Sequence, residues 1–367
     1  MNETSSPPDQ MATAIQLLED DAIAALRDLR FQMLRGSTVL VTGASGFVGS
    51  HLLSCFLQMQ RQFQGDLSIH AAVQQVPPWL SSMGSPGRVT FHQGNLTELG
   101  FLSSLPAADV IIHAATYGQP KLFAAAQETT LRLNTIATFF LLDKLRGGGK
   151  FMFLSSSEVY SGLTDFPFRE VQIGTTNTTH PRACYIEGKR CGEAICSAYR
   201  SKGVDAKAVR LCHAYGPGTR CGDRRALNSF IDMGLRDNRI TLLDAGLARR
   251  SYGYISDVGA MLWRILLLGR EAVYNVGGDY RTTIAALARK LGSMMQVEVS
   301  IPDDQGSNLS GAPDEVRVCI QKFETEFGTV KFTTPDLGLD RTIAWQTAIR
   351  EIEKKEAMQV MASQAAP

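Results

Sequence analysis

The sequence predicts an α/β protein: a doubly wound parallel sheet followed by a smaller C-terminal α/β lobe. From Ser37 onward, short apolar runs alternate with helical patterns. Strands that alternate with helices favour a parallel sheet covered by helices on both faces. A glycine-rich turn at residues 43–49 directly follows the first apolar run and opens a helix. The chain of 367 residues is long enough for a substantial core.

Residues 1–36 are expected to form a leader and an amphipathic helix. Residues 1 to about 10 are polar and rich in Ser and Pro, so we expect them to be disordered. Between residues 13 and 35, apolar side chains recur every three or four positions, which predicts a helix that packs on the main domain. Binding of a partner protein is the alternative role. The apolar positions are Ile15, Leu18, Ala22, Leu26, Leu29 and Met33.

Six apolar runs predict the strands of a main domain at residues 37–214. They lie at residues 38–42, 69–73, 89–91, 110–113, 151–155 and 206–211. After residue 214 the pattern changes to arginine-rich loops, helices and short strands. We expect residues 215–350 to form mainly a substrate-binding lobe over the carboxyl ends of the strands, where open α/β sheets bind ligands.

Two further segments complete the predicted organisation. Residues 251–280 are expected to return partly to the main domain, with 274–278 at the main sheet or its border. Residues 351–367 are predicted to form a tail, and its small and polar residues from Ala357 onward indicate fraying.

Composition restricts the partners and the compartment. The net charge is +1, from 37 basic and 36 acidic residues, so no bulk field favours nucleic acid or an anionic membrane. The apolar runs are too short to span a bilayer, and the polar start argues against a secretory signal. Seven cysteines without a Cys-x-x-Cys pair indicate reduced thiols and no metal site. We therefore expect a cytoplasmic protein.

The turn at residues 43–49 has the spacing of a dinucleotide-binding turn, in which Ser45, Phe47 and Val48 surround three glycines. Gly43 permits the tight turn, Gly46 lets a pyrophosphate approach the backbone, and Gly49 lets the helix pack on the strand. The N-terminus of the following helix faces the phosphates. Because the turn follows the first strand of an alternating chain, we favour a Rossmann-type cofactor site over a mere tight turn.

The rest of the cofactor site is less strongly marked. The acidic residue that usually follows the second strand and binds the adenine ribose is missing, and Gln74 stands in that region. No Arg or Lys stands there to favour a 2′-phosphate, so NAD is preferred and NADP stays open. Positions after the third and fourth strands are expected to line the adenine and ribose, or else to be ordinary loop and core residues: Asn95, Leu96, Ala114 and Ala115.

Tyr185 and Lys189 lie four positions apart on a predicted helix and share one face. An ammonium there can stabilise a phenolate and lower a tyrosine pKa that starts near about 10, so that Tyr185 acts as a base. Ser156, Ser157 and Glu158 follow the fifth strand and supply hydroxyls and a spare carboxylate. These parts suit hydride chemistry on an alcohol. The structural alternatives are an exposed helix pair, serine turn residues and a capping carboxylate.

Taken in order, these motifs resemble the extended short-chain dehydrogenase/reductases of the NAD-dependent epimerase/dehydratase family, which act on nucleotide sugars. Residues 181–190 are most similar to those of UDP-glucuronate decarboxylases (UDP-xylose synthases), and dTDP-glucose 4,6-dehydratase-like proteins are also similar. The resemblance covers roughly residues 37–350. It rests on the glycine turn, Ala114-Ala115, Asn134, residues 155–160, Tyr185 with Lys189, Tyr215-Gly216-Pro217-Gly218 and residues 274–277.

The resemblance implies roles for the central residues and for the partners. Tyr185 removes the proton of the sugar 4-hydroxyl, Ser156 hydrogen-bonds the same oxygen, and Lys189 tunes Tyr185. Asn134 matches the asparagine that supports the lysine and a proton-relay water. A nucleotide-diphosphate sugar is the expected substrate and NAD the expected cofactor. The expected assembly is a homodimer built through helices at residues 127–145 and 185–201.

The resemblance also implies that Glu158 acts in a second step. Decarboxylation of UDP-glucuronate is the preferred reaction; 4,6-dehydration of a nucleotide hexose and C4 or C5 epimerisation remain alternatives. Ser157 stands where dTDP-glucose dehydratases carry an acidic aspartate, which weakens the dehydratase assignment. A catalytically silent dinucleotide-binding sensor is the alternative from a different class, because a fold alone does not fix an activity.

Three arginines match family positions near the diphosphate or the sugar carboxylate: Arg225, Arg250 and Arg317. A guanidinium group pairs well with the planes of phosphate and carboxylate groups. Each could instead be a solvated surface charge, and for Arg249 we favour that interpretation. The sequence around Arg225 and Arg317 differs from that of the decarboxylases, so the nucleobase and the sugar of the substrate remain open.

Overall fold

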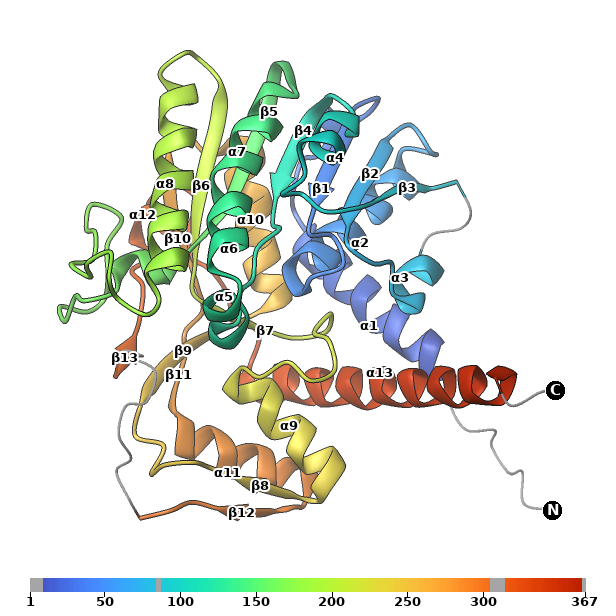
Figure 1. The fold of residues 1–367 in the computed structure, drawn as a ribbon, viewed down its shortest axis with the longest axis vertical. Helices are drawn as coiled ribbons and strands as arrows, with labels where there is room; N and C mark the ends of the chain where they lie inside the picture. The colour runs from blue at the N-terminus through green and yellow to red at the C-terminus, as the bar shows by residue number, and fades with distance from the viewer. Residues whose placement is uncertain (1–8, 84–86, 304–313, 365–367) are drawn as a thin grey trace.

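The computed structural model describes residues 9–83, 87–303 and 314–364, and it has two lobes (Figure 1). The larger lobe holds a parallel sheet of seven strands in the order β10-β6-β5-β4-β1-β2-β3. The six predicted strands and the predicted return of residues 274–278 are all present in it. Their bounds are β1 Thr38–Thr42, β2 Ser68–Val73, β3 Val89–Gln93, β4 Ala108–His113, β5 Leu145–Ser156, β6 Asp205–Leu211 and β10 Val273–Val276.

Helices cover both faces of this sheet because its strands are apolar on both sides. In β1, Val39 and Val41 face one core and Leu40 faces the other. The first core includes α1 (Gln10–Ala25), α2 (Phe47–Gln62), α3 (Pro78–Met83) and α10 (Ile255–Leu268). The second includes α4 (Leu99–Ser104), α6 (Gln127–Asn134), α7 (Ile136–Asp143) and α8 (Ala183–Arg200). The short helix α5 (Pro120–Ala125) precedes α6.

The smaller lobe lies beyond the carboxyl ends of the strands (Figure 1). Its own core surrounds α9 and α11. Strand β9 lies in the smaller sheet, where it pairs with β7, β11 and β13. The bounds are β7 His213–Tyr215, α9 Ala226–Asp237, β8 Arg239–Thr241, β9 Arg249–Tyr254, β11 Tyr280–Thr283, α11 Ile284–Met295, β12 Glu298–Ser300 and β13 Glu315–Val316. Helix α12 (Gln321–Phe327) instead packs against β10 of the main sheet.

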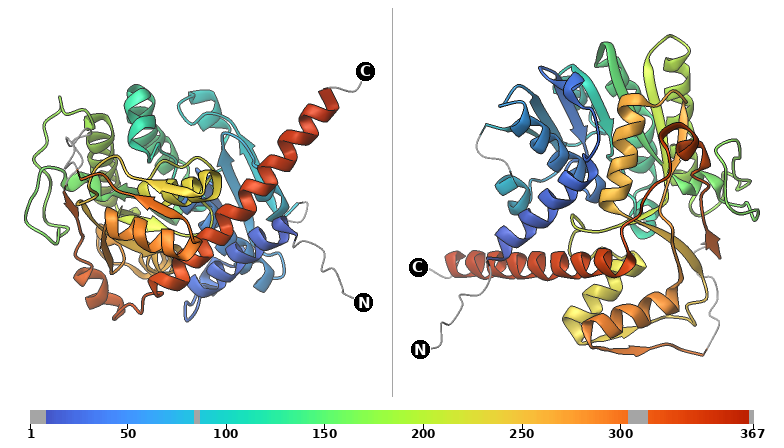
Figure 2. Two further views of the ribbon diagram at one scale, coloured as in Figure 1. Left: turned by 90° about the horizontal axis from the view of Figure 1, so that it is seen from below. Right: turned by 180° about the vertical axis from the view of Figure 1, so that it is seen from behind.

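Helix α1 packs on the main domain, against α2 and α10, and it also lies beside α13 (Figure 2). It is shorter than the predicted helix at 13–35, since Asp28 adopts a left-handed backbone with φ 59° and only a short 3₁₀ turn, Gln32–Leu34, follows. Of the predicted apolar positions beyond the helix, Leu29 is buried without being helical, whereas Met33 is exposed, so the prediction that Met33 faces the core is wrong. The predicted disordered leader lies largely outside the described residues.

The C-terminal helix α13 (Pro335–Gln364) runs past both lobes (Figure 2). The predicted tail from residue 351 is therefore wrong for residues 351–364, which continue this helix. No Gly or Pro interrupts these positions, and Glu, Lys, Ala and Met are good helix formers. Residues 365–367 of the predicted tail lie outside the described residues. No helix in the described ranges is both long and apolar enough to cross a membrane.

A buried polar cluster joins the N- and C-terminal helices to β9. The Tyr254 hydroxyl donates to both carboxylate oxygens of Asp21 at 2.9 Å. Arg341 of α13 lies 3.1 Å from Asp21 and donates to the Tyr254 hydroxyl at 2.8 Å, while Asp20 lies 3.5 Å from Arg341. Burial raises the pKa of Asp21 to about 7, against the opposing effect of Arg341. Helix α1 is therefore an integral part of the fold.

This raised pKa predicts a pH-dependent stability. The folded chain keeps the Asp21 proton between about pH 4 and 7 while the unfolded chain loses it, so stability falls as pH rises through that window. Asp21→Asn cannot ionise, and it should gain stability relative to the wild type between pH 4.5 and 8. Urea unfolding of both proteins across that range gives the difference in their free energies of unfolding. The contributions of all other titrating groups cancel in this difference. Parallel curves would contradict the prediction.

Candidate active site

The glycine turn joins the ends of β1, β2 and β4. The Gly43 amide donates to Ala72 at 3.0 Å, and its φ of +68° is a left-handed conformation that favours glycine. A Cβ atom at Gly43 would lie 2.7 Å from the Cα of Ala115, and one at Gly49 would overlap the carbonyl oxygen of Gly43. The turn is thus as tight as predicted, with Ala114 and Ala115 directly beside it.

The start of α2 fits a pyrophosphate. Gly46 is the N-cap residue and no side chain caps the helix, so the first-turn amides of Phe47 and Val48 receive no side-chain hydrogen bond. The first turn carries no acidic side chain. Helix N-termini attract anions through these amides and through the helix dipole. The turn and helix would therefore hold the two phosphates of a dinucleotide.

The remaining predicted cofactor residues differ in how free they are. Gln74 is exposed just after β2. Leu96 is buried below the next turn. The side-chain oxygen of Asn95 accepts hydrogen bonds from the amide and hydroxyl of Thr97, at 3.0 and 2.9 Å. Asn95 thus stabilises the turn before α4, and its carbonyl oxygen is already engaged.

Tyr185 lies at the start of α8, with its ring stacked on Phe123 at 4.7 Å between centroids. Burial raises the pKa of Tyr185 to about 12, although a hydrogen bond with Ser156 and the charges of Arg182 and Arg225 act in the opposite direction. The predicted lowering of this pKa is therefore not found in the protein chain. Phe123 comes from α5, so this burial is a tertiary effect that spacing along α8 does not reveal.

Lys189 is buried one turn below Tyr185 on the same helix. Its ammonium lies 5.7 Å from the centre of the Tyr185 ring and donates to the carbonyl oxygen of Leu154 at 2.5 Å. Burial lowers the pKa of Lys189 to about 7, against the raising effect of Glu193. The predicted pairing of Tyr185 and Lys189 on one face is present, with the ammonium directed to β5.

Asn134 lies against α8 beside this pair. Its side-chain amide donates to Thr130 at 2.7 Å and to the Thr116 hydroxyl at 3.1 Å. Its side-chain oxygen is buried and has no hydrogen-bond partner among the described residues. A buried acceptor without a partner is costly and is commonly satisfied by an ordered water. This arrangement suits the relay position that the resemblance implies for Asn134.

The end of β5 and the short 3₁₀ helix Ser157–Tyr160 place the serines and Glu158 beside Tyr185. The Ser156 hydroxyl accepts from the Glu158 amide at 3.2 Å and also hydrogen-bonds Tyr185. The Ser157 hydroxyl instead acts on the Cys212 thiol, where burial raises the pKa and the hydroxyl lowers it to a smaller extent. Ser156, Glu158 and Tyr185 are therefore brought together, with Ser157 on the side of β7.

Glu158 is paired with Arg182, a residue that sequence analysis did not identify as part of the site. The Arg182 Nε donates to Glu158 Oε2 at 3.0 Å, and the second nitrogen–oxygen pair, Nη2 and Oε1, is shorter still. The Arg182 side chain is 9% exposed and its guanidinium lies 5.4 Å from the Phe123 ring centre. A bidentate pair fixes the carboxylate geometry. The one feature of the sequence that could have indicated a role for Arg182 is its position three residues before Tyr185.

Positive charge gathers around His213, a residue that sequence reasoning also missed. The imidazole lies 5.6 Å from the ring of Tyr252 on β9. Burial, together with the charges of Arg250, Arg225 and Arg182, lowers the pKa of His213 to about 3. A neutral imidazole near three guanidinium groups, of which two are paired with Glu158 and Asp223, marks a site of net positive charge.

The three predicted arginines are not equivalent. Arg225 is paired with Asp223 and lies 5.4 Å above the Phe47 ring, next to the glycine turn. Arg250 donates to two carbonyl oxygens, of Arg249 and Asp314, at 2.7 and 3.2 Å. The Nε of Arg317 has no hydrogen-bond partner in the described ranges, and Glu315 lies 3.6 Å away. The charges of Arg225 and Arg250 thus act on His213. No contact among the described residues brings Arg317 close to His213.

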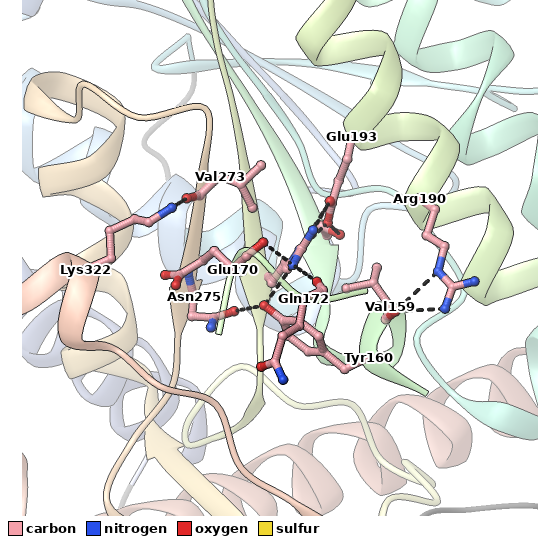
Figure 3. Close-up of polar contacts among 11 residues, drawn as sticks. Val159, Tyr160, Glu170, Gln172, Arg190, Glu193, Val273, Asn275 and Lys322 are labelled. Atoms are coloured by element: carbon pink, nitrogen blue, oxygen red, sulfur yellow. Dashed lines mark hydrogen bonds and ion pairs between the residues drawn. The ribbon is translucent and has the colours of Figure 1, made fainter. Parts of the chain in front are cut away.

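A buried network supports the end of β5 from behind (Figure 3). Arg210 of β6 forms a two-point ion pair with Glu193 and donates to the Tyr160 hydroxyl at 2.9 Å. The Tyr160 hydroxyl donates to the side chain of Asn275 on β10 at 2.7 Å. The Ser155 hydroxyl donates to Glu193 at 2.5 Å. The residues on either side of Ser156–Glu158 are therefore fixed by buried hydrogen bonds.

A groove of about 530 Å³ opens beside the site, between the segment that follows Tyr160 and strand β9. Ser161, Thr176 and His180 line one side, and Arg249 and Glu315 line the other. Arg249 itself is exposed, as expected. Among the described residues, no group of three or more His, Cys, Asp or Glu side chains is placed to hold a metal ion.

The fold and this site define a dinucleotide-dependent enzyme of the Rossmann type. The chain matches the NAD dependent epimerase/dehydratase family over residues 39–277, and it belongs to that family. It is 29% identical over 276 residues to UDP-glucuronic acid decarboxylase 6 of Arabidopsis thaliana, covering 72% of this chain and 78% of the relative. It is 29% identical over 313 residues to UDP-glucuronic acid decarboxylase 1 of Xenopus tropicalis, covering 83% and 71%.

Solved structures confirm the fold. DesIV, a dTDP-glucose 4,6-dehydratase from Streptomyces venezuelae crystallised with NAD and TYD, aligns with a TM-score of 0.73 and 23% identity, over 86% of this chain and 98% of that one. The UDP-glucuronic acid 4-epimerase from Bacillus cereus, in complex with UDP-glucuronic acid and NAD, aligns with a TM-score of 0.69 and 21% identity, over 84% and 99%. The predicted fold class, family and NAD cofactor are confirmed.

The geometry of the turn predicts unequal effects of glycine substitutions. Gly49→Ala should lower both the NAD content of the purified protein and its melting temperature, because the new methyl group would overlap the carbonyl of Gly43. Gly100→Ala, whose methyl group would meet no atom within 4 Å, is the matched control. Release of bound NAD by heat and a thermal melt provide the two readouts. Full NAD content in Gly49→Ala would contradict the assignment of the turn.

Proposed function

We propose that the protein is an NAD-dependent nucleotide-sugar decarboxylase that acts on a nucleoside-diphosphate glucuronate, most simply UDP-glucuronate. The observation that carries this proposal is the placement of the Glu158–Arg182 ion pair directly beside Tyr185, within a cluster of guanidinium groups. The curated relatives of similar sequence are UDP-glucuronic acid decarboxylases, which supports the same reaction.

The charge of the site favours an acidic sugar. Arg182, Arg225 and Arg250 all act on His213, whereas Glu158 and Asp223 are each paired with one of these arginines. A nucleoside-diphosphate glucuronate brings a diphosphate and a sugar carboxylate, and guanidinium groups pair with both kinds of anion. The neutral hexose of a dehydratase substrate lacks the carboxylate. The excess positive charge is thus better matched by the glucuronate.

The oxidation step uses Tyr185 and its neighbours. NAD, when bound, supplies the acceptor for the hydride of the sugar C4 and later returns it. Tyr185 takes the proton of the 4-hydroxyl, and Ser156 orients the same oxygen through its hydroxyl. Lys189 provides a nearby cation whose lowered pKa lets it exchange protons near neutrality. Asn134 offers its buried acceptor oxygen to a relay water.

The second step follows from the C4 ketone. The sugar is then a β-keto acid, and its C5 carboxylate leaves as carbon dioxide, with the electron pair of the broken C–C bond passing into an enolate. Protonation at C5 and return of the hydride to C4 complete a redox-neutral reaction. Glu158 lies beside Tyr185, where it can deliver the proton to C5. Arg182 is a positioning residue that holds the Glu158 carboxylate in a fixed orientation.

We further propose that the protein works as a homodimer in the cytoplasm. Exposed apolar side chains lie on α6 and α7, where Leu131 is 39% and Phe139 is 45% exposed. These helices and α8 correspond to the segments for which we expect a dimer interface. Sedimentation of the wild-type protein used in the assay below measures this directly, and a single-chain mass would contradict it.

A mass-spectrometric assay with nucleoside-diphosphate sugars tests the function. UDP-glucuronate should lose the mass of carbon dioxide, with no net NADH formed. Tyr185→Phe should lower kcat by at least about 10²–10⁴-fold while NAD stays bound, because a proton-transfer group is lost. Tyr199→Phe, which removes a hydroxyl that bonds Asp143 near the far end of the same helix, is the matched control.

The same assay separates the rival reactions. Glu158→Gln should slow protonation at C5, and therefore turnover, and let NADH absorbance build up, because C4 oxidation does not require the carboxylate. Loss of water from a nucleotide hexose would show a dehydratase instead, and altered stereochemistry at constant mass would show an epimerase. Bound NAD with no conversion of any nucleotide sugar would support the silent sensor. Each of these three results would overturn the proposal.

A further inference from the structure

A second cationic group faces the glycine turn from the connection between the two lobes. Arg220 lies in the segment between β7 and α9, far from the turn in sequence. Its Nε donates to the carbonyl oxygen of Ser45 at 3.1 Å, and its Nη2 donates to the Ser45 hydroxyl at 2.7 Å. Both partners are neutral, and the residue retains exposed surface. The guanidinium is therefore fixed at the turn while remaining accessible.

The segment that carries Arg220 is held in place on both sides. Gly218, with φ +105°, passes so close to α2 that a Cβ atom there would lie 2.8 Å from the Ser50 hydroxyl. The carbonyl oxygen of Thr219 accepts a hydrogen bond from the indole of Trp345 on α13 at 2.7 Å, and Trp345 is fully buried. The segment thus presses Arg220 onto the start of α2.

The electrostatics of this arrangement call for an anion. The uncapped start of α2 is the positive end of a helix dipole. Arg220 adds a full positive charge beside it. The charge of Glu353 on α13 reaches Arg220, but Arg220 takes part in no ion pair in the part of the chain that the structure describes. Two positive groups directed at one place are unfavourable until a negative group lies between them.

We propose that Arg220 binds the pyrophosphate of NAD from the side opposite the α2 amides. The cofactor's two phosphates would then lie between the helix start and a guanidinium supplied by the inter-lobe connection. Because α13 holds that connection through Trp345 and Thr219, binding of the cofactor also ties the C-terminal helix to the main domain. The inference concerns the family's cofactor and does not rest on the proposed sugar substrate.

Calorimetric titration of nucleotide-free protein with three ligands tests the role of Arg220. NAD and ADP-ribose contain the pyrophosphate, whereas adenosine does not. Arg220→Met should weaken binding of NAD and ADP-ribose by about 10–100-fold, the usual effect of losing a charge-assisted hydrogen bond, and should leave adenosine binding unchanged within about threefold. Arg220→Lys, which keeps the charge without the fork, should be intermediate.

Arg236→Met is the matched control, since Arg236 is an exposed arginine of α9 paired with Asp237. The nucleotide-free Arg220→Met protein should melt no lower than the wild type, because the substitution removes a positive charge from beside the positive end of α2. Unchanged binding of ADP-ribose, or equal weakening of ADP-ribose and adenosine, would overturn the proposal. Should Arg220→Met not fold, undiminished ADP-ribose affinity in Arg220→Lys together with no effect of added salt on the wild type would overturn it as well. No sugar nucleotide is present, so failure here leaves the proposed function standing.

Discussion

Arg210 and Glu193 form a buried ion pair directly behind the end of β5, and the geometry of the site depends on it (Figure 3). Their side chains are only 6% and 9% exposed, so removing one partner would leave a buried charge, at a typical cost of about 3–5 kcal/mol. The pair also satisfies the hydroxyls of Ser155 and Tyr160. One charge pair therefore fixes Ser155 and Tyr160, which lie on either side of the Ser156–Glu158 segment.

The same pair also holds the long irregular segment between β5 and α8. The Arg210 Nη1 that contacts the Tyr160 hydroxyl also donates to the carbonyl oxygens of Glu170 and Gln172, both at 3.0 Å, and this holds the segment that ends at Arg182. Glu193 also raises the pKa of Lys189 against the effect of burial. The Arg210–Glu193 pair thus supports both the segment that positions Arg182 and the protonation of Lys189.

The sequence was sufficient to predict the sheet, the glycine turn and the Tyr185/Lys189 helix, because periodicity and spacing are local signals. It could not reveal the pairing of Glu158 with Arg182, since 24 residues separate them and the segment between them has no regular pattern. The raised pKa of Tyr185 depends on Phe123 of a different helix, and the cationic surroundings of His213 depend on β9 and on the α8 start. The early end of α1 depended on a single left-handed residue, Asp28.

The central claim is that C4 is oxidised transiently and C5 is protonated after decarboxylation. Turnover of UDP-glucuronate in D₂O, with the product studied by NMR, tests both parts at once. We predict one solvent deuterium at C5 and retention of the original hydrogen at C4, because the hydride returns from the bound cofactor. Deuterium at C4, or a decarboxylated product without deuterium at C5, would contradict the account.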